Sequence, residues 1–411
     1  MTSGAISAYG RQTIEDDDVE AVAAVLRGDY LTTGPSVELF ERRLAEAVDA
    51  PYAVSCSSGT AALHLACMAL GADENTFGVV PAITFVATAN ALRYIGAEVL
   101  FADVDAQTGL SGVEHFAASA ASGPEGNAQI LLPVHLNGQC ADPIALWEYA
   151  QDRGMRIIED ACHALGSDYL DGDGQRHKVG ACRHSDMAIF SFHPVKAVAT
   201  GEGGAITTRD PELYHRLCLL RSHGLERNPA HSIASETGSR IAADISAPWY
   251  YEMAEPGYNY RLSDIHAALG ANQMRKLDRF VRQRRELAAY YDSCLSPLAP
   301  HVLPVSKTQG SSHAYHLYVL RFDFEQLELP RSTLVDRLRQ RGIGTQVHYL
   351  PVPEQPYYRR RYGASKCPGA WQYYQSILSL PLHPGMVRED VDRVVAALIE
   401  SLSERGPAAA E

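Results

Sequence analysis

The chain has 411 residues, of which 46% are hydrophobic and 21% charged, and its formal net charge is −13. This length exceeds one modest core and suits two lobes, or one large domain with an appendage. The acidic balance argues against a nucleic-acid-binding protein, because phosphate backbones attract basic faces, but a few local donors can still bind a phosphorylated small ligand.

Two amphipathic helices are predicted first, over residues 14–27 and, after a Gly-Pro turn, within residues 31–48. Short apolar or β-rich runs follow, and helical or looped segments separate many of them: "YAVSCSSGTAALHLACMAL", "TFGVVPAITFVATANALRYIG", "AEVLFADV", "NAQILLPVHLNG", "MRIIEDACHALG", "SDMAIFSFH" and "GGAITT". Non-alternating apolar strands between helices indicate an α/β fold with a mostly parallel sheet covered on both faces.

The pattern changes at Asp264, where a long helix is predicted over "DIHAALGANQMRKLDRFVRQRRELAAYYDSC". After it come "AYHLYVLRF", "STLVDRLRQRG", "GTQVHYL" and a final helix from about Arg388 to Ser403. This alternation fits a smaller α+β lobe. We therefore expect a large domain over residues 1–262 and a smaller C-terminal domain over residues 263–411.

Eight cysteines are present and no two are spaced as Cys-x-x-Cys. The N-terminal sequence "MTSGAISAYGRQTIEDDD" has neither the basic start nor the apolar core of a signal peptide, and no run of eighteen apolar residues occurs. We expect reduced thiols, a cytoplasmic protein and no membrane span. The sixteen histidines include no His-x-x-x-His or His-Glu-x-x-His spacing, so no metal is expected.

Three features lie where predicted strands end, which is where ligands bind in parallel α/β sheets. The turn "SSGTAAL" directly precedes a helix, whose N–H groups and neighbouring hydroxyls can hold an anion. Asp160 ends the apolar strand of "IIEDACHALG", and Phe85 ends another strand. Taken singly, each has an ordinary interpretation: an N-cap turn, a helix cap and a core aromatic.

Lys196 changes this interpretation. It is the one lysine of "SFHPVKAVATGEGGAITT", between an aromatic-His-Pro run and a glycine-rich turn. A lysine, a strand-end aspartate, an aromatic and an anion-binding turn are the parts needed to hold pyridoxal phosphate. The lysine forms the Schiff base, the aspartate keeps the ring nitrogen protonated, the aromatic stacks on the ring and the turn holds the phosphate. A surface loop lysine is the alternative, but four such features in one chain favour the cofactor site.

Segments spread from about Tyr9 to Pro384 resemble the DegT/DnrJ/EryC1/StrS family of pyridoxal-phosphate-dependent sugar-nucleotide aminotransferases. They are "LTTGPSVELFE", "SSGTAALHLA", "PAITFVATANA", "DVDAQTG", "IIEDACHALG", "FSFHPVKAVATGEGGAITT", "LRSHG", "GYNYRLSDIHAALG" and "VHYLPV". The resemblance implies an aspartate-aminotransferase-like fold (pyridoxal phosphate fold type I). Such a fold has a large, mostly parallel sheet domain covered by helices and a smaller C-terminal α+β domain.

The resemblance also implies residue roles. Lys196 matches the Schiff-base lysine, which also carries the proton between the donor Cα and the cofactor. The other cofactor-binding positions are Asp160 at the ring nitrogen, His163 near the phenolic oxygen, Phe85 on the ring, Gly59, Thr60 and Ser191 at the phosphate, and Asn259 reaching in from a second subunit. Residues expected around the sugar nucleotide are Tyr9, Asp29, Tyr30, Leu31, Thr32, Gln346, Val347, His348 and Tyr349.

Within this family, "SFHPVK", "PWYYEMAEPGYNYRLSDI" and "QVHYLPV" look most like the transaminases of pseudaminic acid biosynthesis. That likeness implies a UDP-linked 4-keto-6-deoxy-N-acetylhexosamine as substrate, L-glutamate as amino donor and a homodimer with shared active sites. Alternatives within the family are a 4-keto pentose, a 3-keto sugar or a thymidine-linked hexose. A related dehydratase is disfavoured because its Schiff-base lysine is replaced by histidine. A non-catalytic cofactor or sugar-nucleotide-binding regulator is the alternative from another class.

Overall fold

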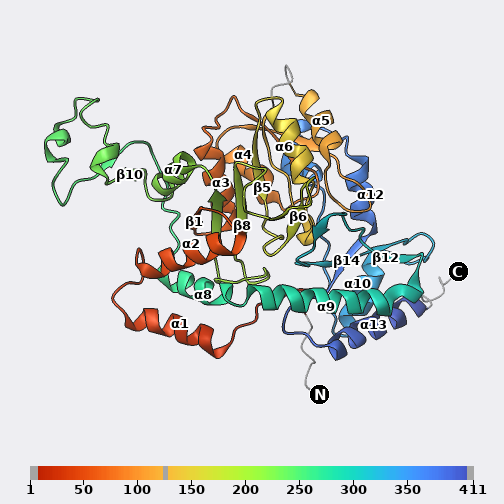
Figure 1. Cartoon of the computed structure of the whole chain (residues 1–411). Coiled ribbons are helices and arrows are strands. Elements are labelled where there is room, and N and C mark those ends of the chain that lie inside the picture. The colour runs from red at the N-terminus through yellow and green to blue at the C-terminus, as the bar shows by residue number, and fades with distance from the viewer. Residues whose placement is uncertain (1–7, 124–127, 405–411) are drawn as a thin grey trace.

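A seven-stranded sheet forms the centre of the computed structural model, which describes residues 8–123 and 128–404 (Figure 1). Its strands in spatial order are β1 (Tyr52–Cys56), β9 (Gly204–Thr208), β8 (Met187–Ser191), β5 (Arg156–Asp160), β4 (Ala128–Leu131), β2 (Phe77–Pro81) and β3 (Glu98–Ala102). Strand β9 is antiparallel to β1 and β8, and the remaining pairs are parallel. The expected mostly parallel sheet is confirmed, and the carboxyl ends of β1, β2, β5 and β8 lie along one edge.

Helices cover both faces of this sheet, because successive strand residues point to opposite sides and both sides are apolar. Ile189 packs in a core with α3, α4 and α7, whereas the next residue, Phe190, packs in a core with α2 and α8. Val79 and Leu131 pack against α5 and α6. The helices of this part are α1 (Asp16–Arg27), α2 (Pro35–Val48), α3 (Gly59–Ala69), α4 (Val86–Tyr94), α5 (Val113–Ala121), α6 (Pro143–Gln151), α7 (Pro211–Arg221) and α8 (Asp264–Met274).

A smaller antiparallel sheet and its helices form the C-terminal part, around a core that includes Tyr291, Leu320 and Leu398. Its elements are α9 (Leu277–Leu295), β12 (Val302–Pro304), β14 (Tyr318–Phe322), α10 (Arg331–Gln340), α11 (Pro356–Tyr362), α12 (Pro368–Ser376), β15 (Ile377–Leu380) and α13 (Arg388–Ser403). The division between residues 262 and 263 stays a prediction. Helix α8, just beyond it, packs in the same core as Phe40 of α2.

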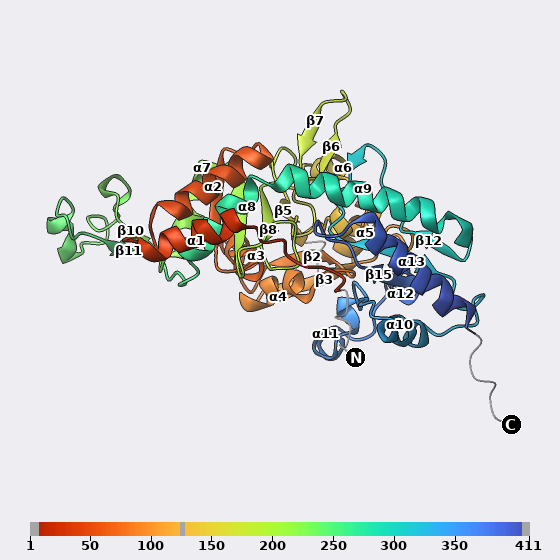
Figure 2. The ribbon, with the colours of Figure 1, turned by 90° about the horizontal axis from the view of Figure 1, so that it is seen from below.

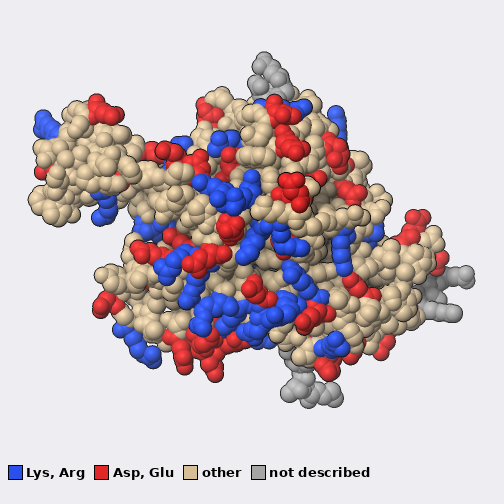
Figure 3. All heavy atoms as spheres, viewed as in Figure 1, with Lys and Arg blue, Asp and Glu red and all other residues tan. Residues whose placement is uncertain are grey.

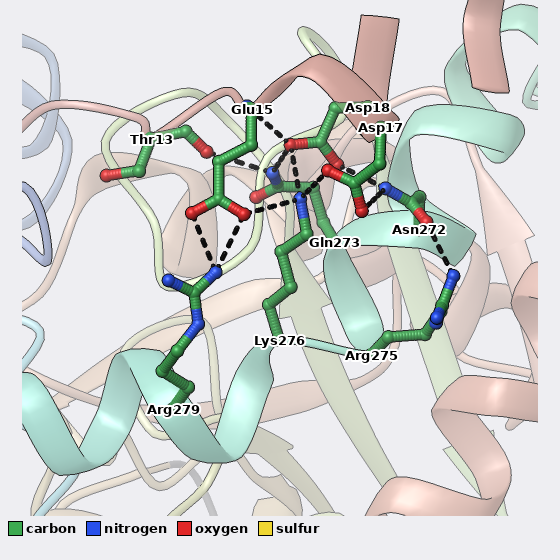
Figure 4. Close-up of polar contacts among 9 residues, drawn as sticks. All are labelled: Thr13, Glu15, Asp17, Asp18, Asn272, Gln273, Arg275, Lys276 and Arg279. Carbon is green, nitrogen blue, oxygen red and sulfur yellow. Dashed lines mark hydrogen bonds and ion pairs between the residues drawn. The ribbon is translucent and has the colours of Figure 1, made fainter. Parts of the chain in front are cut away.

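The long helix predicted from Asp264 is two helices, because the chain tightens between α8 and α9. The N–H groups of Arg275 and Lys276 donate three residues back, to Asn272 and Gln273, instead of four. At this junction Lys276 turns its amine toward acidic residues at the start of α1, as Figure 4 shows. The contact fastens α1 to the junction of α8 and α9.

Residues 227–257, here called the excursion, project away from the body of the molecule in two perpendicular views (Figures 1 and 2). A short ribbon of β10 (Leu225–Glu226) and β11 (Glu252–Met253) closes its base. The excursion exposes large apolar side chains, with Trp249 72% and Met253 62% exposed. Its 3₁₀ turns are η3 (Pro229–His231) and η4 (Arg240–Asp244).

The remaining elements are short. They are η2 (Leu136–Gly138), β6 (Asp168–Leu170), β7 (Arg176–Lys178), η5 (Ser296–Leu298), β13 (Ser311–Ser312) and η6 (Val352–Glu354). Acidic and basic side chains both occur on the face drawn in Figure 3, where basic side chains gather along α9 and acidic ones gather below them at the start of α1. Within residues 8–123 and 128–404, no helix is both long and apolar enough for a membrane span.

Candidate active site

A cavity of about 480 Å³ opens at the sheet edge where β1, β2, β5 and β8 end. The C-terminal part closes one side of it with the segment from Gln346 to Tyr349. The sequence-predicted residues that line this cavity are Tyr9, Gly59, Thr60, Phe85, Asp160, His163, Ser191, Lys196, Gln346, Val347, His348 and Tyr349. Residues far apart in the chain therefore meet here, as expected for the carboxyl edge of a parallel sheet.

Lys196 lies in the turn between β8 and β9. Its backbone N–H donates to the His193 carbonyl oxygen at 2.8 Å, which closes the turn. The chain then returns so closely that a side chain at Gly204 would place its Cβ 2.2 Å from the Ser58 carbonyl oxygen, so glycine is required there. Burial lowers the pKa of the Lys196 amine, and the neighbouring Cys162 and Asp160 only partly oppose this effect. The turn thus presents an amine that loses its proton more readily than a surface lysine.

Asp160 ends β5 with its carboxylate held at both oxygens. The Thr88 hydroxyl donates to Oδ2 at 2.7 Å, and the Cys162 backbone N–H donates to Oδ1 at 3.2 Å. The residue is only 6% exposed. A buried, oriented carboxylate of this kind suits a cationic ring nitrogen.

Thr88 was not among the sequence-predicted site residues. Its hydroxyl lies 2.8 Å from that of Thr84, which lies in the connection between β2 and α4. The only sequence signal was this pair of threonines four residues apart at a strand-to-helix junction. Such spacing places two side chains on one helix face, but it says nothing about an aspartate 72 residues away.

The amino end of α3 faces the cavity beside Ser191. Ser58 caps the helix by accepting a hydrogen bond from the Ala61 N–H at 3.1 Å. A Cβ at Gly59 would lie 2.9 Å from the Ser191 Cβ, so only glycine lets β8 pass this close to the helix. The first-turn N–H groups and the hydroxyls of Thr60 and Ser191 face one cavity, where groups of this kind can bind an anion.

His163 and His348 bring imidazole rings to the cavity in their neutral form. Burial, reinforced by Lys196, holds the pKa of His163 well below its usual range and lowers that of His348 to about 3. The Asn137 N–H donates to His163 Nδ1 at 3.3 Å, which leaves the proton on Nε2. That Nε2 lies 3.2 Å from the Tyr349 hydroxyl. His163 can therefore donate one hydrogen bond without adding positive charge beside Lys196.

These residues fit pyridoxal phosphate. The anion site at α3, the Asp160 carboxylate and the Lys196 amine match the phosphate, the ring nitrogen and the aldehyde carbon. Phe85 follows β2 with 57% of its surface exposed, which leaves a ring face free to stack. Gly59 supplies the most specific evidence, because a Cβ would be forced against Ser191 in this cradle.

Five sequence-predicted residues lie outside the cavity that this chain forms alone. Asp29, Tyr30, Leu31 and Thr32 are exposed in the connection from α1 to α2, where Thr32 forms a β-bridge to Ser263. Asn259 is exposed and forms a β-bridge to Ser222. Conversely, Ser58, Thr84, Cys162, His193 and Glu202 line the cavity without having been predicted.

Comparison with known proteins agrees with this geometry. The model of a family described as the DegT/DnrJ/EryC1/StrS aminotransferase family matches residues 12–399. One relative, the spore coat polysaccharide biosynthesis protein SpsC of Bacillus subtilis (strain 168), is 35% identical over 393 residues, 95% of each chain.

Solved structures show the same similarity. The Helicobacter pylori protein PseC, an aminotransferase involved in the biosynthesis of pseudoaminic acid, superimposes with a TM-score of 0.84 at 27% identity, covering 97% of this chain and 99% of its own. Spr1654 of Streptococcus pneumoniae, described as a sugar aminotransferase, gives a TM-score of 0.83 at 26% identity in its PLP form, covering 97% and 98%. The same protein has also been solved in its PMP form.

Proposed function

Because the chain belongs to the DegT/DnrJ/EryC1/StrS aminotransferase family and uses pyridoxal phosphate, we propose that it transfers the amino group of L-glutamate to a UDP-linked 4-keto-6-deoxy-N-acetylhexosamine, a step of pseudaminic acid biosynthesis. The observation that carries the proposal is the single cavity lined by Lys196, Asp160 and the amino end of α3. An amine, a carboxylate and an anion site in one cavity are what amino-group transfer requires.

Pyridoxal phosphate, when bound, supplies an aldehyde that condenses with amines and a ring that accepts the electron pair of a deprotonated Cα. Lys196 Nζ is the base of the reaction: its lowered pKa makes the amine easier to deprotonate, and the neutral amine can accept the donor's Cα proton and return it. Asp160 stays oriented toward the ring nitrogen because Thr88 and the Cys162 N–H hold its two oxygens.

The remaining groups bind and orient. The amino end of α3, with Thr60 and Ser191, would hold the phosphate, and Phe85 would cover one face of the ring. His163 directs its Nε2–H into the site because Nδ1 is engaged by the Asn137 N–H. Tyr9, His348 and Tyr349 form the aromatic wall next to the sugar; the Tyr9 and His348 ring centroids are 5.1 Å apart.

We further propose a homodimer with two shared sites. Asp29 to Thr32 and Asn259 match substrate and phosphate positions of the family, yet they are exposed and outside this chain's own cavity. Apolar side chains such as Trp249 and Met253 are exposed on the excursion, as expected for a surface that another copy covers. A two-fold axis would let each chain complete the other's site.

The hexosamine assignment rests on the resemblance of three segments and on the similarity to PseC. A 4-keto pentose or a thymidine-linked keto-hexose is the alternative substrate, since Lys196 and Asp160 act on the amino group and not on the sugar. SpsC, named for spore coat polysaccharide biosynthesis, also points to sugar chemistry in general. The eight cysteines are all free thiols, which supports the proposed cytoplasmic location.

Mass spectrometry of the products tests the function. The holoenzyme is incubated with isotopically labelled glutamate and, in parallel, with each member of a panel of UDP- and dTDP-linked keto sugars. We expect labelled nitrogen in the 4-amino sugar formed from the UDP-linked 4-keto-6-deoxy-N-acetylhexosamine, and faster labelling of this sugar than of any other member of the panel. Transfer only to another sugar would overturn the substrate, and a loss of visible cofactor absorbance on adding glutamate would still support an aminotransferase. No transfer and no absorbance change would favour a non-catalytic binder.

A further inference from the structure

A cluster of two histidines and a glutamate lies at the base of the excursion, outside the catalytic cavity. His215 is on α7, Glu226 is on β10 and His231 ends η3. His215 Nε2 lies 2.6 Å from Glu226 Oε2, and His231 Nδ1 lies 3.1 Å from His215 Nε2 and 3.3 Å from Glu226 Oε2. Three ligand-type atoms from three separate elements therefore converge on one point.

The glutamate of this cluster is held in one orientation. Its Oε1 accepts hydrogen bonds from the backbone N–H groups of Arg227 at 2.8 Å and Asn228 at 2.7 Å. Its Oε2 is thereby left facing the two imidazoles. Hydrogen bonds that fix one oxygen of a carboxylate while the other is free are typical of the shell around protein-bound metals.

Both imidazole nitrogens face the same carboxylate oxygen and lie 3.1 Å from each other. Neutral rings can occupy this arrangement by donating N–H groups to Glu226 Oε2, and a cation in place of those protons would be bound by all three atoms. Ligand atoms about 2.0–2.1 Å from a tetrahedral ion stand about 3.3 Å apart. The nitrogen–nitrogen distance and the His231–Glu226 distance are close to that value, whereas the His215–Glu226 pair, at 2.6 Å, has hydrogen-bond length and would have to open on binding the ion.

We propose that His215 Nε2, His231 Nδ1 and Glu226 Oε2 bind one divalent ion of the zinc class, with water completing a tetrahedron. Two imidazoles and one carboxylate are ligands that Zn²⁺ prefers, whereas Mg²⁺ demands oxygen ligands in an octahedron. Side-chain exposures of 40% for His215 and 48% for His231, against 8% for Glu226, leave the site open to solvent on the imidazole side.

The bound ion fastens the excursion to the body. The ion joins α7 to Glu226, just before the excursion, and to His231 within it. Helix α7 itself packs in the main core through Leu213, Leu217 and Leu220. None of the three ligands lines the catalytic cavity. The proposed role of the ion is to hold the excursion against α7, and the His-x₁₀-Glu-x₄-His spacing matches neither His-x-x-x-His nor His-Glu-x-x-His.

Calorimetric titration with Zn²⁺ tests the site. Untagged, chelator-treated holoenzyme is titrated as wild type and as the His215→Ala, His231→Ala and His301→Ala variants. His301 is an exposed histidine of the C-terminal part and serves as the matched control. We expect one ion per wild-type chain, unchanged binding in His301→Ala, and affinity lowered by at least about a hundredfold in the two ligand variants, since even outer-shell changes reach that size. Mg²⁺ at excess should not compete.

Hydrogen exchange gives a second readout in the same samples. Zn²⁺ should slow amide exchange across residues 227–257 in wild type and in His301→Ala, but not in His231→Ala, whose exposed side chain can be removed without disturbing the core. Wild-type binding no tighter than that of a His215→Ala/His231→Ala double variant would overturn the site. Equal loss of binding in His301→Ala would also overturn it.

Discussion

Two lysines of this chain are withdrawn from water and treated in opposite ways. Lys276, between α8 and α9, directs its amine to Glu15 Oε2 at 3.0 Å, Asp17 Oδ1 at 2.5 Å and Asp18 Oδ2 at 2.8 Å (Figure 4). Burial opposes its charge, but the hydrogen bonds that the amine donates to these acids outweigh burial and raise the pKa of Lys276. Lys276 is a fixed cation with a structural task.

The amine of Lys196 is also shielded from water, but it lacks the hydrogen bonds to carboxylates that raise the pKa of Lys276. Among the described residues, no carboxylate forms an ion pair with its amine, and Asp160 is engaged by Thr88 and the Cys162 N–H instead. Burial therefore dominates and its pKa falls. A paired lysine therefore fastens α1 to the junction of α8 and α9, whereas an unpaired one is left free to exchange its proton. Making the same substitution at both positions separates the two roles.

The largest expected effect is on turnover in Lys196→Met. Without the amine, the cofactor loses its point of attachment and the proton transfer at the donor Cα loses its base. We therefore expect kcat to fall by at least about 10⁴-fold. The unfolding free energy of the cofactor-free protein should change little, because no ion pair is lost. Steady-state assays and urea unfolding measure both quantities. Turnover above about a hundredth of wild type would remove Lys196 from the mechanism.

Lys276→Met should show the reverse. Asp18, with no exposed surface, would lose its cationic partner, so stability should fall by about 3 kcal/mol. This figure is at the low end because Asn272 and Gln273 still donate to Asp18. Urea unfolding of cofactor-free protein measures the loss, and kcat per folded molecule should remain near wild type. An unchanged unfolding midpoint would mean that the network does not stabilise the fold.

Asp160→Asn tests the carboxylate that lies near Lys196 but forms no ion pair with it. An amide cannot hold a positive ring nitrogen, so the half-reaction with glutamate should slow by about a hundredfold, equivalent to about 2.7 kcal/mol. Thr88→Val, which removes the hydroxyl but keeps the shape, should cost less because it only loosens the orientation of Asp160. Stopped-flow absorbance measures both variants. Near-normal rates in Asp160→Asn would make Asp160 a structural cap.

The sequence predicted what depends on local pattern. Short apolar runs between helices predicted the sheet, and residues just after those runs predicted most of the cavity lining, because parallel strands end at one edge. The glycine-rich turn after Lys196 is required by the close approach of Gly204 to Ser58. A turn of this kind has a sequence signature of its own.

Contacts between distant segments could not be predicted. The acids of "IEDDD" mark a helix start, which is correct, but nothing local tells that they also pair with Lys276 more than 250 residues away. No local sequence signal predicted the hydrogen bond from Thr88 to Asp160 or the break between α8 and α9. Helical periodicity continues across that break, since Leu277 and Val281 pack in the same core as Met274.

A mixing experiment tests whether the site that contains Lys196 is completed by Asn259 of a second chain. The network of Lys276 lies within one chain. Asn259→Ala should lower activity about tenfold by removing a hydrogen bond to the phosphate. Lys196→Met and Asn259→Ala proteins are then dissociated mildly and reassociated. If the two residues act in trans, each mixed dimer has one site with both residues intact, and activity should exceed that of either parent. Verified mixed dimers without a gain would place Asn259 in its own chain's site or outside it.

The smallest expected effect is a difference in pH dependence around Lys276. Its hydrogen bond lowers the pKa of Asp17 to about 2, and hydrogen bonds from Arg279 and then Lys276 lower that of Glu15. A carboxyl whose folded-state pKa is depressed stabilises the fold above its ordinary pKa near 4, and this contribution is lost as the pH falls toward 2. The effect is modest because the Asp17 and Glu15 side chains are 47% and 36% exposed.

Urea unfolding between about pH 5 and pH 2.5 should therefore show the stabilities of wild type and Lys276→Met converging as the pH falls. Lys196→Met should stay parallel to wild type over the same range, because no carboxylate of this network depends on Lys196. A constant gap between wild type and Lys276→Met would mean that the amine acts through packing of its stem and not through the charges of Asp17 and Glu15.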